Sequence, residues 1–261
     1  MIARLPDDKL ADLRSTLGSL RSRRSLKRKE LEQLLGNFNF ASRVIIPGRT
    51  FMRHLYDALM HTTKPYHHVR LSYGCQLDLL WWSHLLEGWN GKALLLQSHV
   101  TAADDISIET DASGSIGYGA LYGPEWFAVC WPRHLTARCI TFKELYPICV
   151  ACATRGHKWS RMRICFHSDN TAVVAVVASG ASKCPNVMAL LRQIFFICAK
   201  GNFMITARHI PGVTNVRADA LSRQELLRFR NLHPTANRNP SDPRRLPSRP
   251  GETASAPCAS S

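Results

Sequence analysis

The sequence Ile106-Ser107-Ile108-Glu109-Thr110-Asp111 alternates apolar and polar side chains, which is the period-two pattern of a half-buried β-strand. A turn rich in glycine follows at Gly114, Gly117 and Gly119, and Trp126-Phe127-Ala128-Val129-Cys130-Trp131 is again strand-like. We therefore predict three consecutive antiparallel strands in this part of the chain.

Helices and further strands follow this region. Thr141-Phe142-Lys143-Glu144 has the pattern of a capping box that opens a helix running to about Gly156. After it we predict a strand at 163–167, helices at 171–178 and 185–199, a strand at 203–208 and a last helix at 215–228. Strands joined by helical crossovers lie parallel, so the order βββαβααβα predicts an α/β fold with a mixed five-stranded sheet flanked by helices.

The regions on either side of residues 104–230 have a different texture. Leucines and aromatic residues recur at helical spacing through residues 1–97, which predicts an N-terminal all-helical module. Within it, residues 21–29 carry a dense run of cations that would suit either phosphate contacts or a solvated loop. Residues 231–261 are rich in Pro, Ser, Arg and Asn, and we expect them to form a disordered basic tail.

The charge of the chain narrows the class of partner. The 261 residues hold 34 Lys+Arg against 19 Asp+Glu, a net charge of +15, so nucleic acid is the first partner we expect. The sequence holds no long apolar run and begins with Pro6, Asp7 and Asp8 where a signal peptide needs an apolar core. We expect no membrane insertion and an intracellular protein, with cytoplasm and nucleus both open.

The nine cysteines lie mostly in apolar stretches and are odd in number, which indicates reduced, buried thiols. Cys149 and Cys152 form a C-x-x-C pattern, but no second pair follows at the spacing of a zinc finger. Burial is therefore favoured over metal binding for this pair.

Four acidic residues occupy positions where strands end or helices begin: Asp111, Glu144, Asp169 and Asp219. If the strands pair as predicted, Asp111 and Asp169 end neighbouring strands, and the helix that carries Glu144 can place its carboxylate over them. Converging carboxylates repel one another unless protons or cations neutralise them, and oxygen ligands alone favour Mg²⁺ or Mn²⁺. Two such ions about 4 Å apart can promote phosphodiester hydrolysis, which is the chemistry we infer.

Each acid also has a purely structural explanation. Glu144 fits the third position of the capping box, and Asp169 fits a helix cap or a turn. Asp219 would favour the N-terminal dipole of the last helix, and Asp111 would start a turn. The joint occurrence of the four acids in this order of elements favours a catalytic role over these structural ones.

His209, ten residues before Asp219, lies in a loop from which a histidine can reach bound metals, although a lone loop histidine is more often inert.

Short motifs surround these residues: Thr110-Asp111-Ala112-Ser113, Lys143-Glu144-Leu145, His167-Ser168-Asp169-Asn170 and Asn215-Val216-Arg217-Ala218-Asp219-Ala220-Leu221-Ser222-Arg223. Together they resemble the type 1 ribonuclease H domain of retroelement reverse transcriptases. The resemblance implies a ribonuclease H-like fold and binding of two Mg²⁺ ions, or Mn²⁺, by Asp111, Glu144, Asp169 and Asp219. It also implies that His209 assists proton movement or product release.

The first third of the chain is similar to the thumb and connection region of retrotransposon polymerases, particularly the DIRS-like group. Gly36-Asn37-Phe38-Asn39-Phe40-Ala41 and Trp81-Trp82 carry this similarity. The polymerase motif Tyr-x-Asp-Asp is missing, and no fingers or palm precede Met1. We therefore expect no DNA synthesis by this chain alone, and a separate polymerase subunit is an open partner.

The resemblance implies cleavage of the RNA strand of RNA:DNA hybrids, with the RNA recognised through its 2′-hydroxyls. Ser113 and Asn170, each close to an acid, are the residues we predict to contact sugar or phosphate. Since no basic insertion lies between Asp169 and Asp219, grip on the hybrid is expected from residues 21–29 and the helical module. Two alternatives stay open: a catalytically silent nucleic-acid-binding remnant, and an integrase or transposase, whose usual set is three acids.

Overall fold

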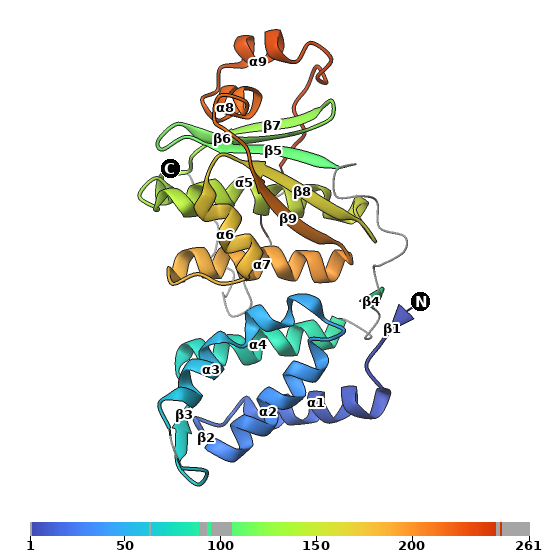
Figure 1. Cartoon of the computed structure of the whole chain (residues 1–261), viewed down its shortest axis with the longest axis vertical. Coiled ribbons are helices and arrows are strands. Elements are labelled where there is room, and N and C mark those ends of the chain that lie inside the picture. Colours follow the sequence, from blue (N-terminus) through green and yellow to red (C-terminus); the bar gives the residue numbers. More distant parts are fainter. Residues whose placement is uncertain (1, 63, 89–92, 95–105, 244–245, 247–261) are drawn as a thin grey trace, which may run out of the picture. The chain divides into compact units, whose positions relative to one another are not determined.

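The computed structural model describes residues 2–62, 64–88, 93–94, 106–243 and 246 (Figure 1). The chain divides into two units, one within residues 1–95 and the other within residues 96–246. Among the described residues, no helix combines the length and the apolar character needed to cross a bilayer.

The first unit is built mainly from helices α1 (Asp7–Leu20), α2 (Arg28–Ala41), α3 (Arg53–Met60) and α4 (Tyr73–Gly88), with a 3₁₀ helix at Ile46–Phe51. The leucines at helical spacing in α1 and α2 are buried, as their spacing predicts. Phe38 of α2 stacks on Trp82 of α4 with ring centroids 4.3 Å apart. Trp82 is fully buried, so it belongs to the core of this unit.

The sequence predicted an all-helical first unit, but the unit also contains short strands. Strand β2 (Ser25–Lys27) pairs antiparallel with β3 (His68–Arg70), and β1 (Ile2–Ala3) pairs with β4 (Ala93–Leu94). Strands of two or three residues are too short to show a period-two pattern, which is why the sequence did not reveal them.

The cationic residues 21–29 surround β2. Three of them form ion pairs within the unit: Arg21 with Glu87, Arg23 with Glu30, and Arg28 with Glu32. Arg24, Lys27 and Lys29 are exposed. Ion pairing therefore accounts for part of this run, while the three exposed cations keep the predicted phosphate contact open.

The second unit contains the predicted mixed five-stranded sheet. Its strands are β5 (Ser107–Ala112), β6 (Gly117–Tyr122), β7 (Glu125–Cys130), β8 (Arg163–Ser168) and β9 (Met204–His209), in the spatial order β7-β6-β5-β8-β9. The first three strands are antiparallel, and β8 and β9 run parallel to β5. This arrangement confirms the predicted α/β class and agrees with a ribonuclease H-like fold.

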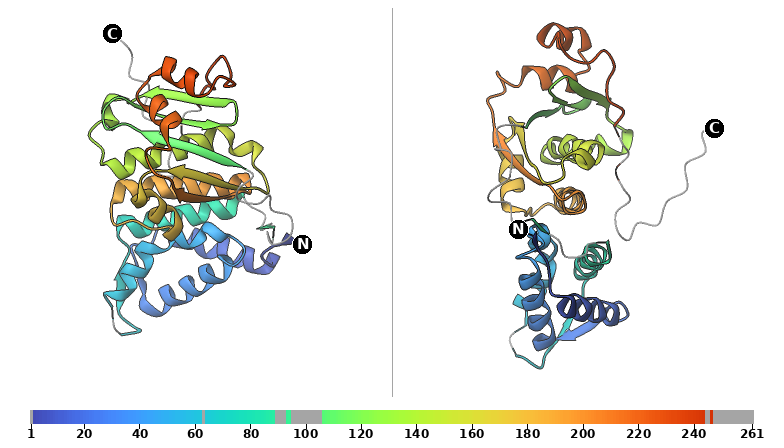
Figure 2. Two further views of the ribbon diagram at one scale, coloured as in Figure 1. Left: turned by 45° about the horizontal axis from the view of Figure 1, so that its top comes forward. Right: turned by 90° about the vertical axis from the view of Figure 1, so that its right-hand side faces the viewer.

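Helices cover both faces of this sheet (Figures 1 and 2). Helix α5 (Ile140–Arg155) packs on β5 and β6, and α7 (Pro185–Gly201) packs against α5. Helix α6 (Thr171–Ser179) lies beside β9, and α8 (Val216–Ser222) covers β6 and β5 from the opposite face. The main core lies between the sheet, α5 and α7, with Leu145, Phe166 and Leu191 almost fully buried. Burial of this apolar layer holds the strand ends in place.

The last helix differs from the prediction of one helix at 215–228. The chain forms α8 and then α9 (Leu226–Leu232), separated by a turn in which Gln224 has a φ of 61°. The turn places Leu221 and Phe229 in one small core with Trp126. On a straight helix these two side chains would be about 12 Å apart along the axis, so packing against β7 favours the break.

Residues 233–243, which we expected to belong to a disordered tail, lie against the edge strand β7. The backbone N–H groups of Asn237 and Ser241 donate to the carbonyls of Pro124 and Trp126, both at 2.7 Å, and the Trp126 indole donates to the Asn237 carbonyl at 2.8 Å. An edge strand offers unpaired carbonyls, and composition does not count such partners. Residues 244–245 and 247–261 of the predicted tail lie outside the described residues.

Gly119 of β6 lies under α8, where a Cβ atom would be 2.5 Å from the Leu221 Cβ and 3.0 Å from the Phe127 carbonyl oxygen. We expect Gly119→Ala to lower the free energy of unfolding by about 1–3 kcal/mol because it forces α8 off the sheet. Gly114→Ala is the matched control, since a Cβ atom at Gly114 would have no described atom within 4 Å. Urea denaturation measures both variants, and equal midpoints would contradict this account of the α8 contact.

Candidate metal centre

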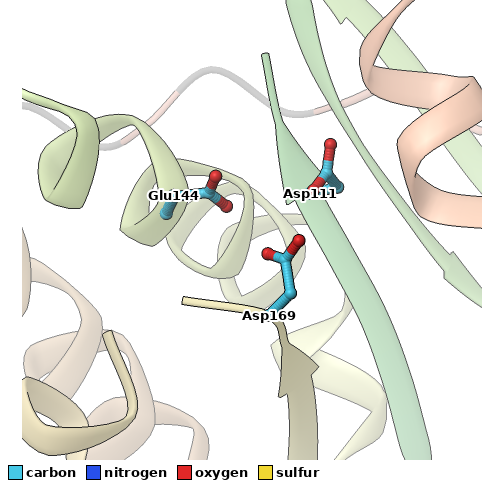
Figure 3. Close-up of side chains that lie close together, drawn as sticks. All are labelled: Asp111, Glu144 and Asp169. Atoms are coloured by element: carbon cyan, nitrogen blue, oxygen red, sulfur yellow. The ribbon is translucent and has the colours of Figure 1, made fainter. Parts of the chain in front are cut away.

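Three of the four predicted acids meet at one edge of the sheet. Asp111 lies near the end of β5, and Asp169 directly follows the parallel neighbour β8, so parallel pairing brings their carboxylates to the same edge. Glu144 reaches them from α5. One carboxylate oxygen of each residue lies within 4.8 Å of the others (Figure 3). Because these residues come from three separate elements, tertiary structure creates the cluster.

The capping box expected at Glu144 does not form. Helix α5 begins at Ile140 after Cys139, and its start makes no side-chain cap hydrogen bond among the described residues. The Glu144 carboxylate instead accepts a hydrogen bond from the backbone of Ala112, at the end of β5. The helix-start explanation for Glu144 is therefore wrong.

Lys143, next to Glu144, is buried, but its ammonium group does not pair with the three carboxylates. Its Nζ donates to the backbone carbonyls of Gly114 and Thr136, the second at 2.6 Å. The side chain thereby holds the turn between β5 and β6. Its hydrogen bonds are with backbone oxygens rather than with the carboxylate cluster.

Asn170, not Asp169, caps helix α6. Its Oδ1 accepts hydrogen bonds from the backbone N–H groups of Ala172 and Val173, at 3.0 and 3.2 Å. The cap explanation offered for Asp169 is therefore wrong, and the Asp169 carboxylate faces Asp111 and Glu144 (Figure 3). Asn170 has a clear structural role, and its predicted contact with substrate stays a prediction.

Ser113 shapes the turn after β5. Its Oγ accepts hydrogen bonds at 2.8 Å from the backbone N–H groups of Ile116 and Gly117. These bonds fix the turn that follows Asp111, so Ser113 acts on the geometry of that strand end. Its predicted contact with sugar or phosphate stays a prediction.

Asp219 lies in the first turn of α8 but outside the three-carboxylate group. Its Oδ1 accepts a hydrogen bond from Arg223 Nε at 2.6 Å, and its Oδ2 accepts one from Arg228 at 2.9 Å. Asn215, at the start of α8, donates its side-chain amide to the Thr110 carbonyl at 3.1 Å and so ties α8 to β5. The structure thus brings Asp219 near Asp111 while both of its oxygens are paired with arginine.

His209 is the last residue of β9, and its Cα pairs with Ser168 of β8 in the sheet register. Its register partner is therefore the residue directly before Asp169. The His209 side chain is exposed. The loop that follows passes close to the site, because a Cβ atom on Gly212 would lie 3.2 Å from Asp169 Oδ2. The proton-transfer role of His209 stays a prediction.

Burial and mutual repulsion disfavour the charged forms of two of the acids. Burial raises the pKa of Asp111 to about 6, with the charges of Asp169 and Asp219 adding to the rise and a hydrogen bond from Ser222 opposing it. Burial also raises the pKa of Glu144 to about 9, with the charges of Asp111 and Asp169 adding to it. The cluster therefore needs either protons or a cation to be stable.

The residues fit a hard divalent cation. Glu144 Oε2 is buried and has no hydrogen-bond partner among the described residues, although a buried carboxylate oxygen normally has one. The group is made of three carboxylates, with Asp169 the most exposed member. A carboxylate-only donor set favours Mg²⁺ or Mn²⁺, and a cation would both neutralise the repulsion and supply the missing partner of Glu144.

Sequence reasoning missed three residues near the site: Ser222, Arg223 and Arg228. Ser222 and Arg223 follow Asp219 by three and four residues, a spacing that places side chains on one helix face, so the helical periodicity of the motif could have revealed them. Arg228 gave no such signal. It reaches Asp219 only because the chain turns at Gln224.

No known family model matches the chain, and no curated protein matches it. Among solved structures, the chain is similar to one described as the "Structure of the foamy viral protease-reverse transcriptase dRH in complex with ds DNA". The two are 14% identical with a TM-score of 0.29, over 77% of this chain and 34% of that chain. The chain thus spans about a third of that chain, and a likeness this low carries no argument for function.

The raised pKa of Glu144 predicts how the metal-free protein responds to pH. Between its ordinary value of 4.5 and about 9, the folded state binds more protons than the unfolded state, so stability falls as pH rises through this window. We expect the Tm in EDTA to fall across the window, and Mn²⁺ to restore it most strongly at alkaline pH, where the carboxylates are ionised.

Glu144→Gln is expected to flatten this pH dependence and to reduce the stabilisation by Mn²⁺, because it removes both the buried carboxyl group that titrates and one proposed ligand. Asp242→Asn is the matched control, since Asp242 is an exposed acid in the same unit. Thermal melts with EDTA or Mn²⁺ measure both variants. A Glu144→Gln protein with the wild-type pH profile would contradict the electrostatic account.

Proposed function

We propose that this chain is a metal-dependent endoribonuclease that hydrolyses the RNA strand of RNA:DNA hybrids and derives from a retrotransposon reverse transcriptase. The observation that supports it is the meeting of the Asp111, Glu144 and Asp169 carboxylates within 4.8 Å of one another at the edge of a mixed sheet. The net charge of +15 suits a nucleic-acid substrate. The four motifs around the acids point to the hybrid as that substrate.

The chain's own residues have distinct roles in this proposal. Asp111, Glu144 and Asp169 would hold one divalent ion, and Asp219 would take part in holding a second. When bound, such ions polarise the phosphodiester and lower the pKa of an attacking water. Burial of Asp111 and Glu144 keeps bulk water from their carboxylates. His209, at the end of β9, is the group that we propose to pass a proton to the departing ribose 3′-oxygen.

Substrate contacts are proposed for the two residues next to the acids. Asn170 uses its Oδ1 to cap α6, and its Nδ2 is the donor that we propose for a 2′-hydroxyl of the RNA strand. Ser113 Oγ also donates to the Gly117 carbonyl at 3.2 Å. Its contact with substrate would therefore compete with the turn after β5. We propose that Asn170 contributes more than Ser113 to recognition of the RNA strand.

One observation favours a second candidate function. Both oxygens of Asp219 are paired with arginine side chains, and Asp219 lies outside the carboxylate group. If these pairs persist on nucleic acid, the chain would bind without cutting, as a silent remnant of a retroelement. That function predicts affinity that falls steeply with salt and no turnover at any Mg²⁺ or Mn²⁺ concentration.

Cleavage of a labelled RNA:DNA hybrid by the full chain tests the proposed activity. We expect Mg²⁺-dependent cleavage that EDTA abolishes, and a loss of at least about a thousandfold in Asp111→Asn, because a ligand of the catalytic cation is removed. Asp242→Asn should cut at the wild-type rate. Undiminished cutting by a folded Asp111→Asn protein would refute the site.

Turnover, measured together with salt-dependent binding, separates the two candidate functions. Hybrid affinity is measured at several salt concentrations alongside turnover in Mg²⁺ and in Mn²⁺. We expect both salt-sensitive binding and metal-dependent cleavage. Binding without any cleavage in either metal would favour the silent remnant, and transfer of DNA strands without hybrid cleavage would favour an integrase-like enzyme.

A further inference from the structure

Two arginines enclose the carboxylate of Asp219, the one predicted acid that the structure leaves outside the cluster. Arg223 Nε donates to Oδ1 at 2.6 Å, and Arg228 donates to Oδ2 at 2.9 Å. Each carboxylate oxygen therefore has its own guanidinium partner. A carboxylate engaged in this way cannot offer the same lone pairs to a metal ion.

Helices α8 and α9 and the turn between them place both arginines at Asp219. Arg223 follows Asp219 by one helical turn at the end of α8. Arg228 lies on α9, and it returns to Asp219 because Gln224 adopts a φ of 61° between the two helices. Arg228 also pairs with Glu225 at 2.7 Å, which fixes its direction. The turn between α8 and α9 thus has an electrostatic consequence in addition to packing Phe229.

The arginine pairs are open to solvent and therefore reversible. The side chains of Arg223 and Arg228 are 50% and 44% exposed, and that of Asp219 is 27% exposed. Exposed ion pairs contribute little to stability and are readily exchanged. Guanidinium groups also bind phosphate oxygens in a bidentate manner, so the phosphate backbone of a nucleic acid is a direct competitor for them.

Arg223 lies close enough to Asp111 to act on that member of the carboxylate cluster. The Asp111 carboxylate experiences the negative charge of Asp219 and the opposing positive charge of Arg223. While the ion pair with Asp219 is formed, the positive charge of Arg223 therefore acts on Asp111 from the side of α8. A divalent ion held between Asp111 and Asp219 would have to displace that charge.

We infer that Arg223 and Arg228 are positioning residues that hold Asp219 and occupy the place of a second divalent cation. When a nucleic acid binds, its phosphates pair with the two arginines and release Asp219. The inference rests on the proposed metal centre and deepens it. The free protein then binds one divalent ion, at Asp111, Glu144 and Asp169. A second ion binds only once Asp219 is released, which makes completion of the centre dependent on substrate.

The stoichiometry of Mn²⁺ binding to the full chain, measured by the electron paramagnetic resonance of free Mn²⁺, tests this inference without relying on activity. We expect wild type to bind one ion and the double variant Arg223→Ala/Arg228→Ala to bind two, with the Kd for the second ion at least about tenfold lower than in wild type. Adding Asp219→Asn to the double variant should return it to one ion.

The charge-matched control is Lys183→Ala/Lys200→Ala, which removes two cations from exposed positions of the same unit. It should bind Mn²⁺ as wild type does. Circular dichroism checks that every variant is folded. Equal binding of the second ion by wild type and the arginine double variant would overturn the inference, as would a second ion that survives Asp219→Asn.

Hybrid binding tests the exchange with phosphate. The arginine double variant should lose affinity, with the slope of log affinity against log salt reduced by up to about two, whereas the lysine control keeps the wild-type slope. An unchanged slope in the arginine variant would overturn the exchange. Hybrid cleavage is measured separately. If wild type cleaves the hybrid but already binds two ions without it, only this inference is refuted. If the ion stoichiometries are as expected but no cleavage occurs, only the proposed activity is refuted.

Discussion

The free-energy cost of burying carboxylates close to one another is the main physical constraint on the second unit. Asp111 and Glu144 are almost fully buried, and their raised pKa values reflect the cost of placing negative charge there. Parallel pairing of β5 and β8 brings Asp111 and Asp169 together, and the packing of α5 on the sheet adds Glu144. An apolar core must hold these elements against the repulsion, and a cation would relieve it.

Helix α8 carries the fourth acid, and its contacts determine where that acid lies. Asn215 ties its start to β5, and the absence of a side chain at Gly119 lets the helix lie close to β6. The turn at Gln224 then returns Arg228 to Asp219. The same short segment therefore carries Asp219, which lies outside the three-carboxylate group, and the two arginines that pair with it.

The predictions from sequence were right where a local pattern reflects burial in the folded protein. They were wrong where a tertiary contact leaves no local pattern. Period-two and helical spacing predicted the order of the elements, since burial of one face leaves a periodic trace. The capping box at Glu144 was wrong because a local motif competed with a tertiary contact, and the carboxylate turned to the end of β5. The tail at residues 233–243 is ordered because β7 offers carbonyls that composition cannot reveal.

Periodicity and residue type were enough to predict the succession of strands and helices, the α/β class and the identity of the acids. Which of these acids meet depends on how the elements pack in three dimensions. Asp111, Glu144 and Asp169 share a site because three elements converge, whereas Asp219 lies outside this group and its two oxygens accept hydrogen bonds from arginines. Distances between side chains remote in sequence depend on packing and charge in three dimensions, and no local pattern encodes them.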